Sequence, residues 1–267
     1  QRQMCIRDRL HKYGAAFDWQ SEWCFLAAVR KFDKPPVTND TGGANIVYYL
    51  KHRLGVSVDP HSHERFYNYA DVAELIRMLD VEPSNVIGGF LYYPPNDPKV
   101  DWEKFRRPVR GNVFRNATWT GRILWGAGTR GHRGPDLFAS GVWRPKDRSH
   151  FITHDPNQPL IYIGCYRRSL HRLGGLQELI QLGQAGKLKP GCYTVSIFVA
   201  QLMLRPRLLR WIEQNILIPA KQWEKQGLIR WATLPEIARI WRTRYRGRPT
   251  IYIPEDQRKL ITSLFPP

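Results

Sequence analysis

The chain has 267 residues, of which 42% are hydrophobic and 12% are aromatic, so it can bury a sizeable core and belongs to neither the disordered nor the fibrous proteins. Its 41 lysine and arginine residues outnumber 23 aspartate and glutamate residues, which gives a formal charge of +18. This excess favours anionic partners, but the basic residues are scattered, which favours a solvated basic surface over a nucleic-acid footprint.

The first residues are not expected to belong to the fold. The run Met4–Arg9 resembles the translation of a transposon sequencing adapter, so we exclude residues 1–9 and expect the natural chain to continue upstream of Leu10. The sequence also contains no apolar run of about eighteen residues, so we expect no transmembrane helix.

Strands and helices are predicted to alternate along the remaining chain. Short apolar runs predict strands, and apolar residues at helical spacing predict helices. Ser21 and Asn45 are expected to begin helices, Gly55 to end one, and Pro219 to kink a long one. The predicted strands are 15–19, 56–58, 85–93, 122–125, 139–143, 160–164, 193–200 and 228–232, and the predicted helices are 21–29, 45–54, 70–79, 173–184, 206–226 and 235–245.

This alternation predicts a parallel α/β fold. Because no glycine-rich nucleotide-binding loop follows a predicted strand, we favour a distorted, TIM-like (β/α) barrel of about seven strands over a doubly wound sheet. We expect a single domain over residues 10–267, incomplete at its N-terminus, with an irregular insert at about 94–160.

The histidine motif after the predicted strand 56–58 carries the most chemical information. His61 and His63 are separated by one residue, so on an extended segment their side chains point the same way and can reach one metal ion. Asp59 and Glu64 flank the pair and can add an oxygen ligand, orient a histidine or assist catalysis. A zinc ion held there would lower the pKa of a water to ~7 and polarise a carbonyl, as ester or amide hydrolysis requires. The alternative is a polar turn with two solvent-facing histidines.

Further candidate residues lie near the ends of other predicted strands. His132, in a glycine-rich loop, is a candidate ligand or general acid, and the alternative is a surface histidine. Asp18 and Glu22 flank Trp19, where carboxylates can enter a barrel site and an aromatic ring can stack on a sugar. The alternative for the two acids is an ordinary helix N-terminus.

Three more residues, near the ends of later strands, are candidates for binding substrate. Trp125, Trp143 and Arg144 can line a cleft, because aromatic side chains suit the faces of sugar rings. Packing in the core is the commoner role of tryptophan, so both interpretations of Trp125 and Trp143 stay open.

Three segments carry a family resemblance. Residues 10–17 resemble a first helix leading into a second strand, residues 45–63 a helix, strand and metal-binding histidine motif, and residues 227–238 a last strand and helix. In these segments and in the order of its elements, the chain resembles the carbohydrate (polysaccharide) deacetylase superfamily. The resemblance implies a distorted barrel and a metal-dependent hydrolase that removes acyl groups from a glycan.

The chain departs from the family pattern at two places. The family separates its two histidines by three residues, and Arg65 stands at that position here, so His63 or Glu64 would take the second ligand place. The family's aspartate pair lies on its first strand, which would precede residue 10.

Two other functions stay in view. One is a non-catalytic barrel that binds an acidic glycan or nucleic acid through its basic surface, and the other is an amidohydrolase-like, metal-dependent barrel hydrolase. A carbohydrate is the expected partner, zinc is the expected metal, and nucleic acid is the less favoured partner.

Overall fold

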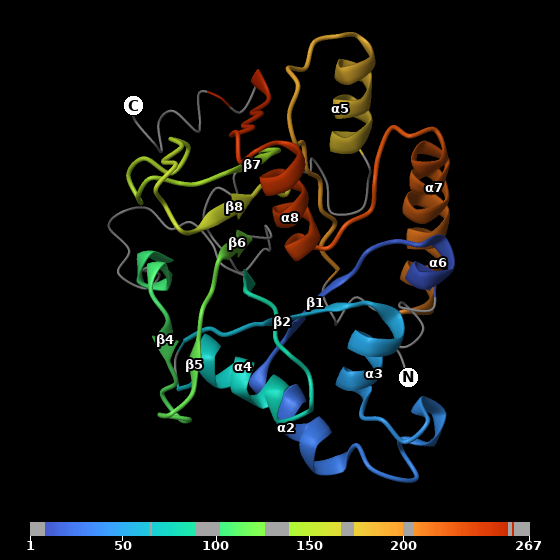
Figure 1. The fold of residues 1–267 in the computed structure, drawn as a ribbon. Helices are drawn as coiled ribbons and strands as arrows, with labels where there is room; N and C mark the ends of the chain where they lie inside the picture. Colours follow the sequence, from blue (N-terminus) through green and yellow to red (C-terminus); the bar gives the residue numbers. More distant parts are fainter. Residues whose placement is uncertain are drawn as a thin grey trace.

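The fold is an α/β arrangement of short strands and mostly short helices (Figure 1). The structure is a computed structural model that describes residues 9–64, 66–88, 102–125, 139–166, 174–199, 205–255 and Arg258. The strands are β1 (Asp18–Ser21), β2 (Ser57–Pro60), β3 (Val86–Gly88), β4 (Val109–Arg110), β5 (Thr118–Trp119), β6 (Ile123–Trp125), β7 (Val142–Trp143) and β8 (Ile161–Ile163).

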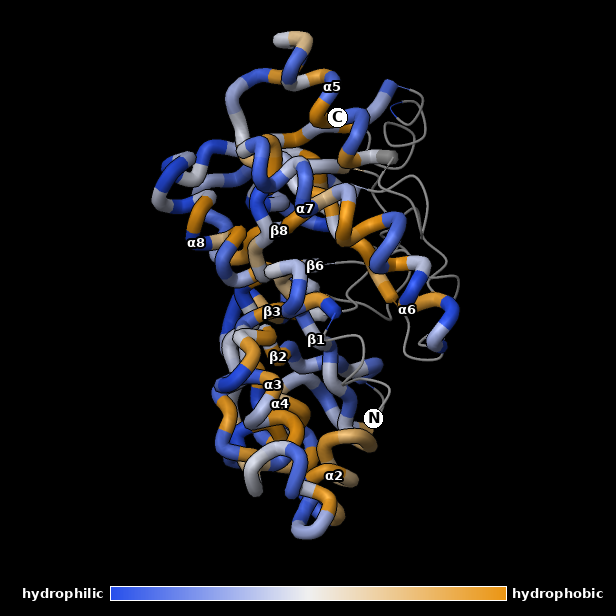
Figure 2. Tube along the Cα trace, turned by 90° about the vertical axis from the view of Figure 1, so that its right-hand side faces the viewer, coloured by the Kyte–Doolittle hydropathy of each residue, from blue (hydrophilic) through white to orange (hydrophobic). Residues whose placement is uncertain are grey.

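Within the described residues, the helices include three short non-α segments. The α-helices are α2 (Trp23–Phe32), α3 (Ile46–Leu54), α4 (Tyr69–Arg77), α5 (Gly174–Gln184), α6 (Pro206–Ile212), α7 (Ile218–Lys225) and α8 (Leu234–Arg244), the 3-10 helices are η1 (Asn39–Thr41) and η2 (Trp102–Arg106), and η4 (Glu213–Leu217) is π-helical. Helices α2, α3 and α4 lie at one end of the molecule and α5 at the other, with the main sheet between them (Figures 1 and 2). In the described part of the chain, no helix has the length and apolar character needed to cross a membrane.

The predicted closed barrel is wrong. The strands form a parallel pair β1-β2, a four-stranded sheet in the order β3-β6-β8-β7 and an antiparallel pair β4-β5. β7 runs antiparallel to β8 at the end of its sheet, and no pairing among the described residues joins β7 to β1. A barrel requires its first and last strands to pair, so this sheet stays open.

The two predicted strands that would have helped to close a barrel are not formed. The described residues 193–199 and 228–232 are irregular, and both segments contribute residues to the lining of a cavity. Their apolar composition is explained by this lining and by their packing against α6 and α7.

An isolated parallel bridge joins the β1-β2 pair to the four-stranded sheet. It pairs His61, directly after β2, with Gly88 at the end of β3. Because β1, β2, β3 and β6 are all parallel, their carboxyl ends meet at one edge, which is where functional side chains gather in α/β proteins.

The strands of the main sheet pack into two different cores, because successive side chains of a strand point to opposite faces. On one face, Ile87 and Leu124 contact an aromatic cluster that contains Trp102, Phe105, Trp119, Trp143 and Phe151. On the other face, Val86 and Ile123 contact α8 through Leu234, Ala238 and Trp241. Helix α8 therefore lies on the same face as Trp125, which belongs to the second core.

The helix boundaries confirm several local predictions. Asn45 caps α3 by accepting a hydrogen bond from the main-chain N–H of Tyr48, and Gly55 ends it with φ 66°. The long helix expected at 206–226 is α6, η4 and α7 in succession, and its π-helical turn lies directly before Pro219. A proline has no N–H to donate to the preceding turn, so the hydrogen-bond ladder widens there. In Figure 2, α6 alternates between apolar and hydrophilic positions, as expected of a helix with one buried face.

Asp71 on α4 organises the loop that packs against α2. Its buried carboxylate accepts hydrogen bonds from the main-chain N–H groups of Asn68 and of residues 112–114, at 2.8–2.9 Å. This fixes Phe114, which stacks on Trp23 of α2 with ring centroids 5.5 Å apart. Asp71 thereby supports the start of α2, next to Glu22.

We predict that Asp71→Asn lowers the free energy of unfolding by about 2–4 kcal/mol. Both carboxylate oxygens of Asp71 accept hydrogen bonds from main-chain N–H groups, and in the variant one of these oxygens is replaced by an NH₂ group, which cannot accept them. Urea unfolding measures this loss. The control Asp40→Asn, at an exposed position, should change stability by less than about 0.5 kcal/mol. Equal stabilities of the two variants would contradict the role given to Asp71.

Candidate metal centre

Glu22 and His61 come from adjacent strand ends. The ladder of β1 and β2 ends with Ser21 opposite Pro60, and the main-chain N–H of His61 then donates to the carbonyl of Ser21 at 2.9 Å. Glu22 and His61 follow the last pair, so they leave the sheet side by side on strands about 4.8 Å apart. His63 lies two residues further along the segment that follows β2.

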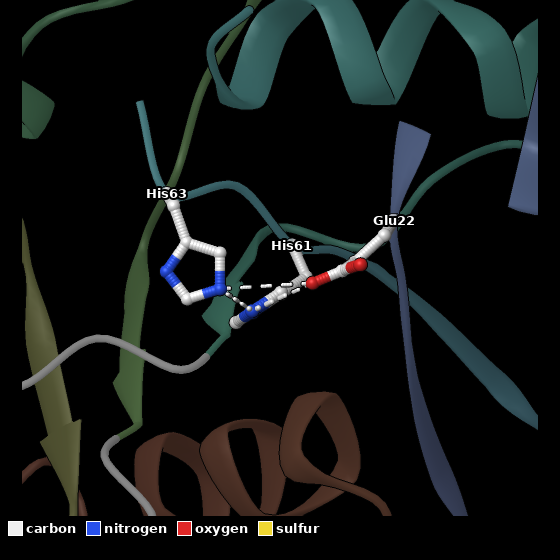
Figure 3. A group of neighbouring side chains, drawn as sticks. All are labelled: Glu22, His61 and His63. Carbon is white, nitrogen blue, oxygen red and sulfur yellow. Dashed lines mark hydrogen bonds and ion pairs between the residues drawn. The ribbon is translucent and has the colours of Figure 1, made fainter. Parts of the chain in front are cut away.

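The three side chains converge on one point (Figure 3). The Nε2 atoms of His61 and His63 are 3.4 Å apart, and Oε1 of Glu22 is 3.6 Å from each of them. The His61 side chain is mostly buried, at 14% exposure, whereas those of His63 and Glu22 are about half exposed, at 57% and 49%. The group Glu22, His61 and His63 can hold a metal ion that stays open to ligands on one side.

The separations of the ligand atoms match a tetrahedral ion. With bonds of about 2.0–2.2 Å, the ligand atoms of a tetrahedral site lie about 3.3–3.6 Å apart. With the same bonds, neighbouring ligands of an octahedral site would be only about 2.8–3.1 Å apart. The observed 3.4 and 3.6 Å are therefore compatible with three ligands of one four-coordinate ion.

A main-chain carbonyl orients the first histidine. Nδ1 of His61 donates to the oxygen of Gly88 at 3.0 Å, and the buried hydroxyl of Tyr69 donates to the same oxygen at 2.5 Å. Because a carbonyl can only accept, Nδ1 carries the hydrogen and Nε2 presents its lone pair to the other two side chains. Burial lowers the pKa of His61, which favours the neutral imidazole that binds metals.

Two carboxyl groups lie on the same two strands, the fully buried Asp59 and the partly buried Asp18. Asp59 has no exposed surface and accepts hydrogen bonds from the hydroxyls of Ser57 and Ser84, at 2.7 and 2.6 Å. Asp18 accepts one from the main-chain N–H of Leu234, at the start of α8. Burial raises the pKa of Asp59 to about 6, and burial together with the charge of Asp59 raises the pKa of Asp18 well above its ordinary value. Both groups tie neighbouring segments together, and Asp59 has no surface with which to touch a substrate.

Glu64, the second carboxylate predicted to assist the histidines, pairs with a lysine instead. Glu64, with φ 53°, forms an ion pair with Lys104 of η2 and does not belong to the group that converges on His61. His132 lies outside the described residues.

The aromatic candidates divide between the cavity and the core. Trp19 and Trp125 both line the cavity described below, and Trp19 also packs edge-on against Phe25. Trp143 has no exposed surface and donates its indole N–H to the carbonyl of Phe151 at 2.7 Å. Arg144 lies over the ring of Trp241 and donates to the carbonyl of Gln158. Neither Trp143 nor Arg144 is among the cavity-lining residues of the described chain.

A cavity of about 1460 Å³ contacts the three candidate ligands. Its other walls come from α5, η4 and α8, from residues 188–199 and 227–232, and from the strand ends that carry Gln20 and Trp125. Small-molecule sites usually measure ~300–1,000 Å³, so this cavity has room for a ligand larger than one sugar ring.

No protein-family model, curated protein or solved structure matches this chain. The deacetylase resemblance therefore remains a prediction, and a function can be argued only from the geometry of the described residues.

The sequence predicted the two histidines as ligands but not their full surroundings. The sequence predicts that Glu22 binds substrate. It does not predict that Glu22 is a ligand, because the approach of Glu22 to His61 depends on the register between β1 and β2. The roles of Gly88 and Tyr69 carry no signature in the sequence, since one acts through its main-chain carbonyl and the other through a hydroxyl on a helix of the core. Gly88 lies inside the predicted strand 85–93, and a glycine within a strand often marks the close approach of another group, which is the signal that could have been followed.

We predict that the protein binds one zinc ion, with His61→Ala and His63→Ala each weakening binding about 100-fold or more and Glu22→Gln by about 10–100-fold. Competition titration with a chromogenic chelator measures these affinities. His150→Ala is a matched control, because His150 also pairs with a carboxylate, that of Asp147 at 2.8 Å. Zinc binding that survives in both histidine variants would contradict this assignment.

Proposed function

We propose that this chain is a zinc-dependent hydrolase that removes acyl groups from a carbohydrate. The observation that carries the proposal is the convergence of His61, His63 and Glu22 beside a large cavity. Two imidazoles and one carboxylate form a donor set used by catalytic zinc sites, in which a fourth position is left for water or substrate.

When bound, zinc supplies Lewis acidity that polarises a carbonyl and lowers the pKa of a water to about 7. The chain's own residues keep this centre in place and accessible. The Gly88 carbonyl fixes the tautomer of His61, and the ladder between β1 and β2 fixes Glu22 beside it. The half-exposed side chains of His63 and Glu22 form the side that a substrate can approach.

The carbohydrate part of the proposal has two supports. One is the resemblance of residues 45–63 to the deacetylase strand and histidine motif, and the other is a cavity with room for more than one sugar ring. Trp19 lines this cavity and offers aromatic surface of the kind that sugar rings contact, whereas Trp125 lines it with only 7% of its surface exposed.

Cationic side chains favour an anionic carbohydrate. Among the described residues that line the cavity, two are acidic, Asp18 and Glu22. The exposed basic residues on the same lining are more numerous: Lys189, Arg230, Arg239 and Arg244. The pKa of Asp18 is raised, which reduces its negative charge, and Glu22 is a proposed metal ligand. The cavity therefore carries positive charge toward a substrate, in line with the +18 of the whole chain.

We predict that the zinc-loaded protein releases acetate from an acetylated polyuronate, and that chelation or His61→Ala lowers kcat/KM about 100-fold or more. Acetate release is followed with a coupled enzyme assay, and His150→Ala serves as the control that keeps activity. Absence of hydrolysis together with salt-sensitive binding of the polymer by metal-free protein would instead identify a non-catalytic binder of acidic polymers. Hydrolysis that resists chelation would contradict the zinc mechanism.

We predict that the double variant Arg239→Glu, Arg244→Glu raises KM for the acetylated polyuronate about tenfold at low salt. Added salt should reduce the difference in KM between the variant and the wild-type protein, because it screens the charges. KM for a neutral acetylated glycan should change little. Arg53→Glu on α3 is the control, because this exposed arginine does not line the cavity. Equal effects on both substrates would show that the cavity does not select for charge.

A further inference from the structure

Two buried hydrogen-bond donors near the candidate metal centre have no acceptor among the described residues. They are the indole Nε1 of Trp125 and the amide Nε2 of Gln20. Trp125 is only 7% exposed, and both residues line the cavity. A buried donor without an acceptor destabilises the fold, so unpaired donors on residues that line a cavity indicate a ligand acceptor.

Strand register places Trp125 close to the metal ligands. Gly88 pairs with His61 on one side and with Trp125 on the other. Adjacent strands lie about 4.8 Å apart, and paired residues of parallel strands point to the same face. His61 and Trp125 therefore flank Gly88 on one face of the sheet.

The missing side chain of Gly88 makes room for Gln20. A Cβ atom at Gly88 would lie 2.5 Å from Cδ of Gln20 and 2.8 Å from its Oε1, so the carboxamide occupies the space over this glycine. Strand pairing puts Gly88 between His61 and Trp125, so the carboxamide over Gly88 lies near both residues.

We propose that Gln20 and Trp125 together bind the carbonyl oxygen of the acyl group that the enzyme removes. This inference rests on the proposed function, and it names the part of the substrate that lies over Gly88. A carbonyl oxygen has two lone pairs and can accept from both donors. Both donors are neutral and their nitrogen atoms are buried, and such donors stabilise the negative charge that develops on the oxygen during acyl transfer.

The chemistry of the donors limits what can bind there. An indole N–H donates and cannot accept, so Trp125 selects an acceptor oxygen over an ammonium or an apolar group. The pair therefore favours esters and amides, whose carbonyl oxygen accepts, and gives the enzyme a means of positioning the acyl group beside the three candidate ligands.

The test uses acetohydroxamate, a small acyl analogue that chelates zinc through its two oxygen atoms, which together keep lone pairs that can accept from Gln20 and Trp125. We expect Trp125→Phe and Gln20→Met, which keep the approximate size of each side chain but remove the donor, to weaken its binding to the zinc-loaded protein about tenfold each. Isothermal titration measures the affinity. Gly88→Ala should act in the same direction, because its Cβ displaces the Gln20 carboxamide.

Controls separate this inference from the proposed function. Trp143→Phe removes an indole N–H that is bonded elsewhere, and it should leave acetohydroxamate binding unchanged. Unchanged binding in both Trp125→Phe and Gln20→Met, with zinc still bound, would overturn the donor pair and leave the metal centre intact. Failure of the wild-type protein to bind zinc would overturn the proposed function itself. If Trp125→Phe does not fold, Gln20→Met alone decides.

Discussion

Parallel backbone pairing across β1, β2 and β3 is the constraint on which the site depends. It brings Glu22 and His61 to one edge of the sheet and places the carbonyl of Gly88 where it accepts from the His61 imidazole. It also sets Trp125 on the far side of Gly88. A metal ligand, its orienting group and the proposed acyl-binding donor thus belong to one row of residues across neighbouring strands, and a register shift of one residue would turn their side chains to the opposite face.

The open sheet and the cavity lie next to each other. Strand β7 occupies the edge beside β8, and residues 193–199, which form no strand, line the cavity. Helix α8 packs its apolar face on the sheet through Leu234, Ala238 and Trp241, and it brings Arg239 and Arg244 to the cavity. One helix therefore contributes both to the core and to the positive charge that we connect with an anionic substrate.

Local signals in the sequence predicted local structure well. Asn45, Gly55 and the apolar spacing of residues 70–79 identify helices that the structure contains, and the position of His61 after a strand was also correct. Barrel closure was wrong, because it depends on pairing between segments far apart in the chain, and the strands are too short for their composition to specify partners. The role of Glu22 was missed for the same reason, since it depends on register. Gln20 was missed because its unpaired N–H can be recognised only once Gly88 is seen beneath it.

The most direct test of the metal centre is a crystal structure of the zinc-loaded protein with anomalous data collected on both sides of the zinc absorption edge. The account predicts a single anomalous peak about 2.0–2.2 Å from Nε2 of His61, Nε2 of His63 and a carboxylate oxygen of Glu22. A zinc peak at another position, or imidazoles at 61 and 63 that point away from each other in the loaded crystal, would contradict it.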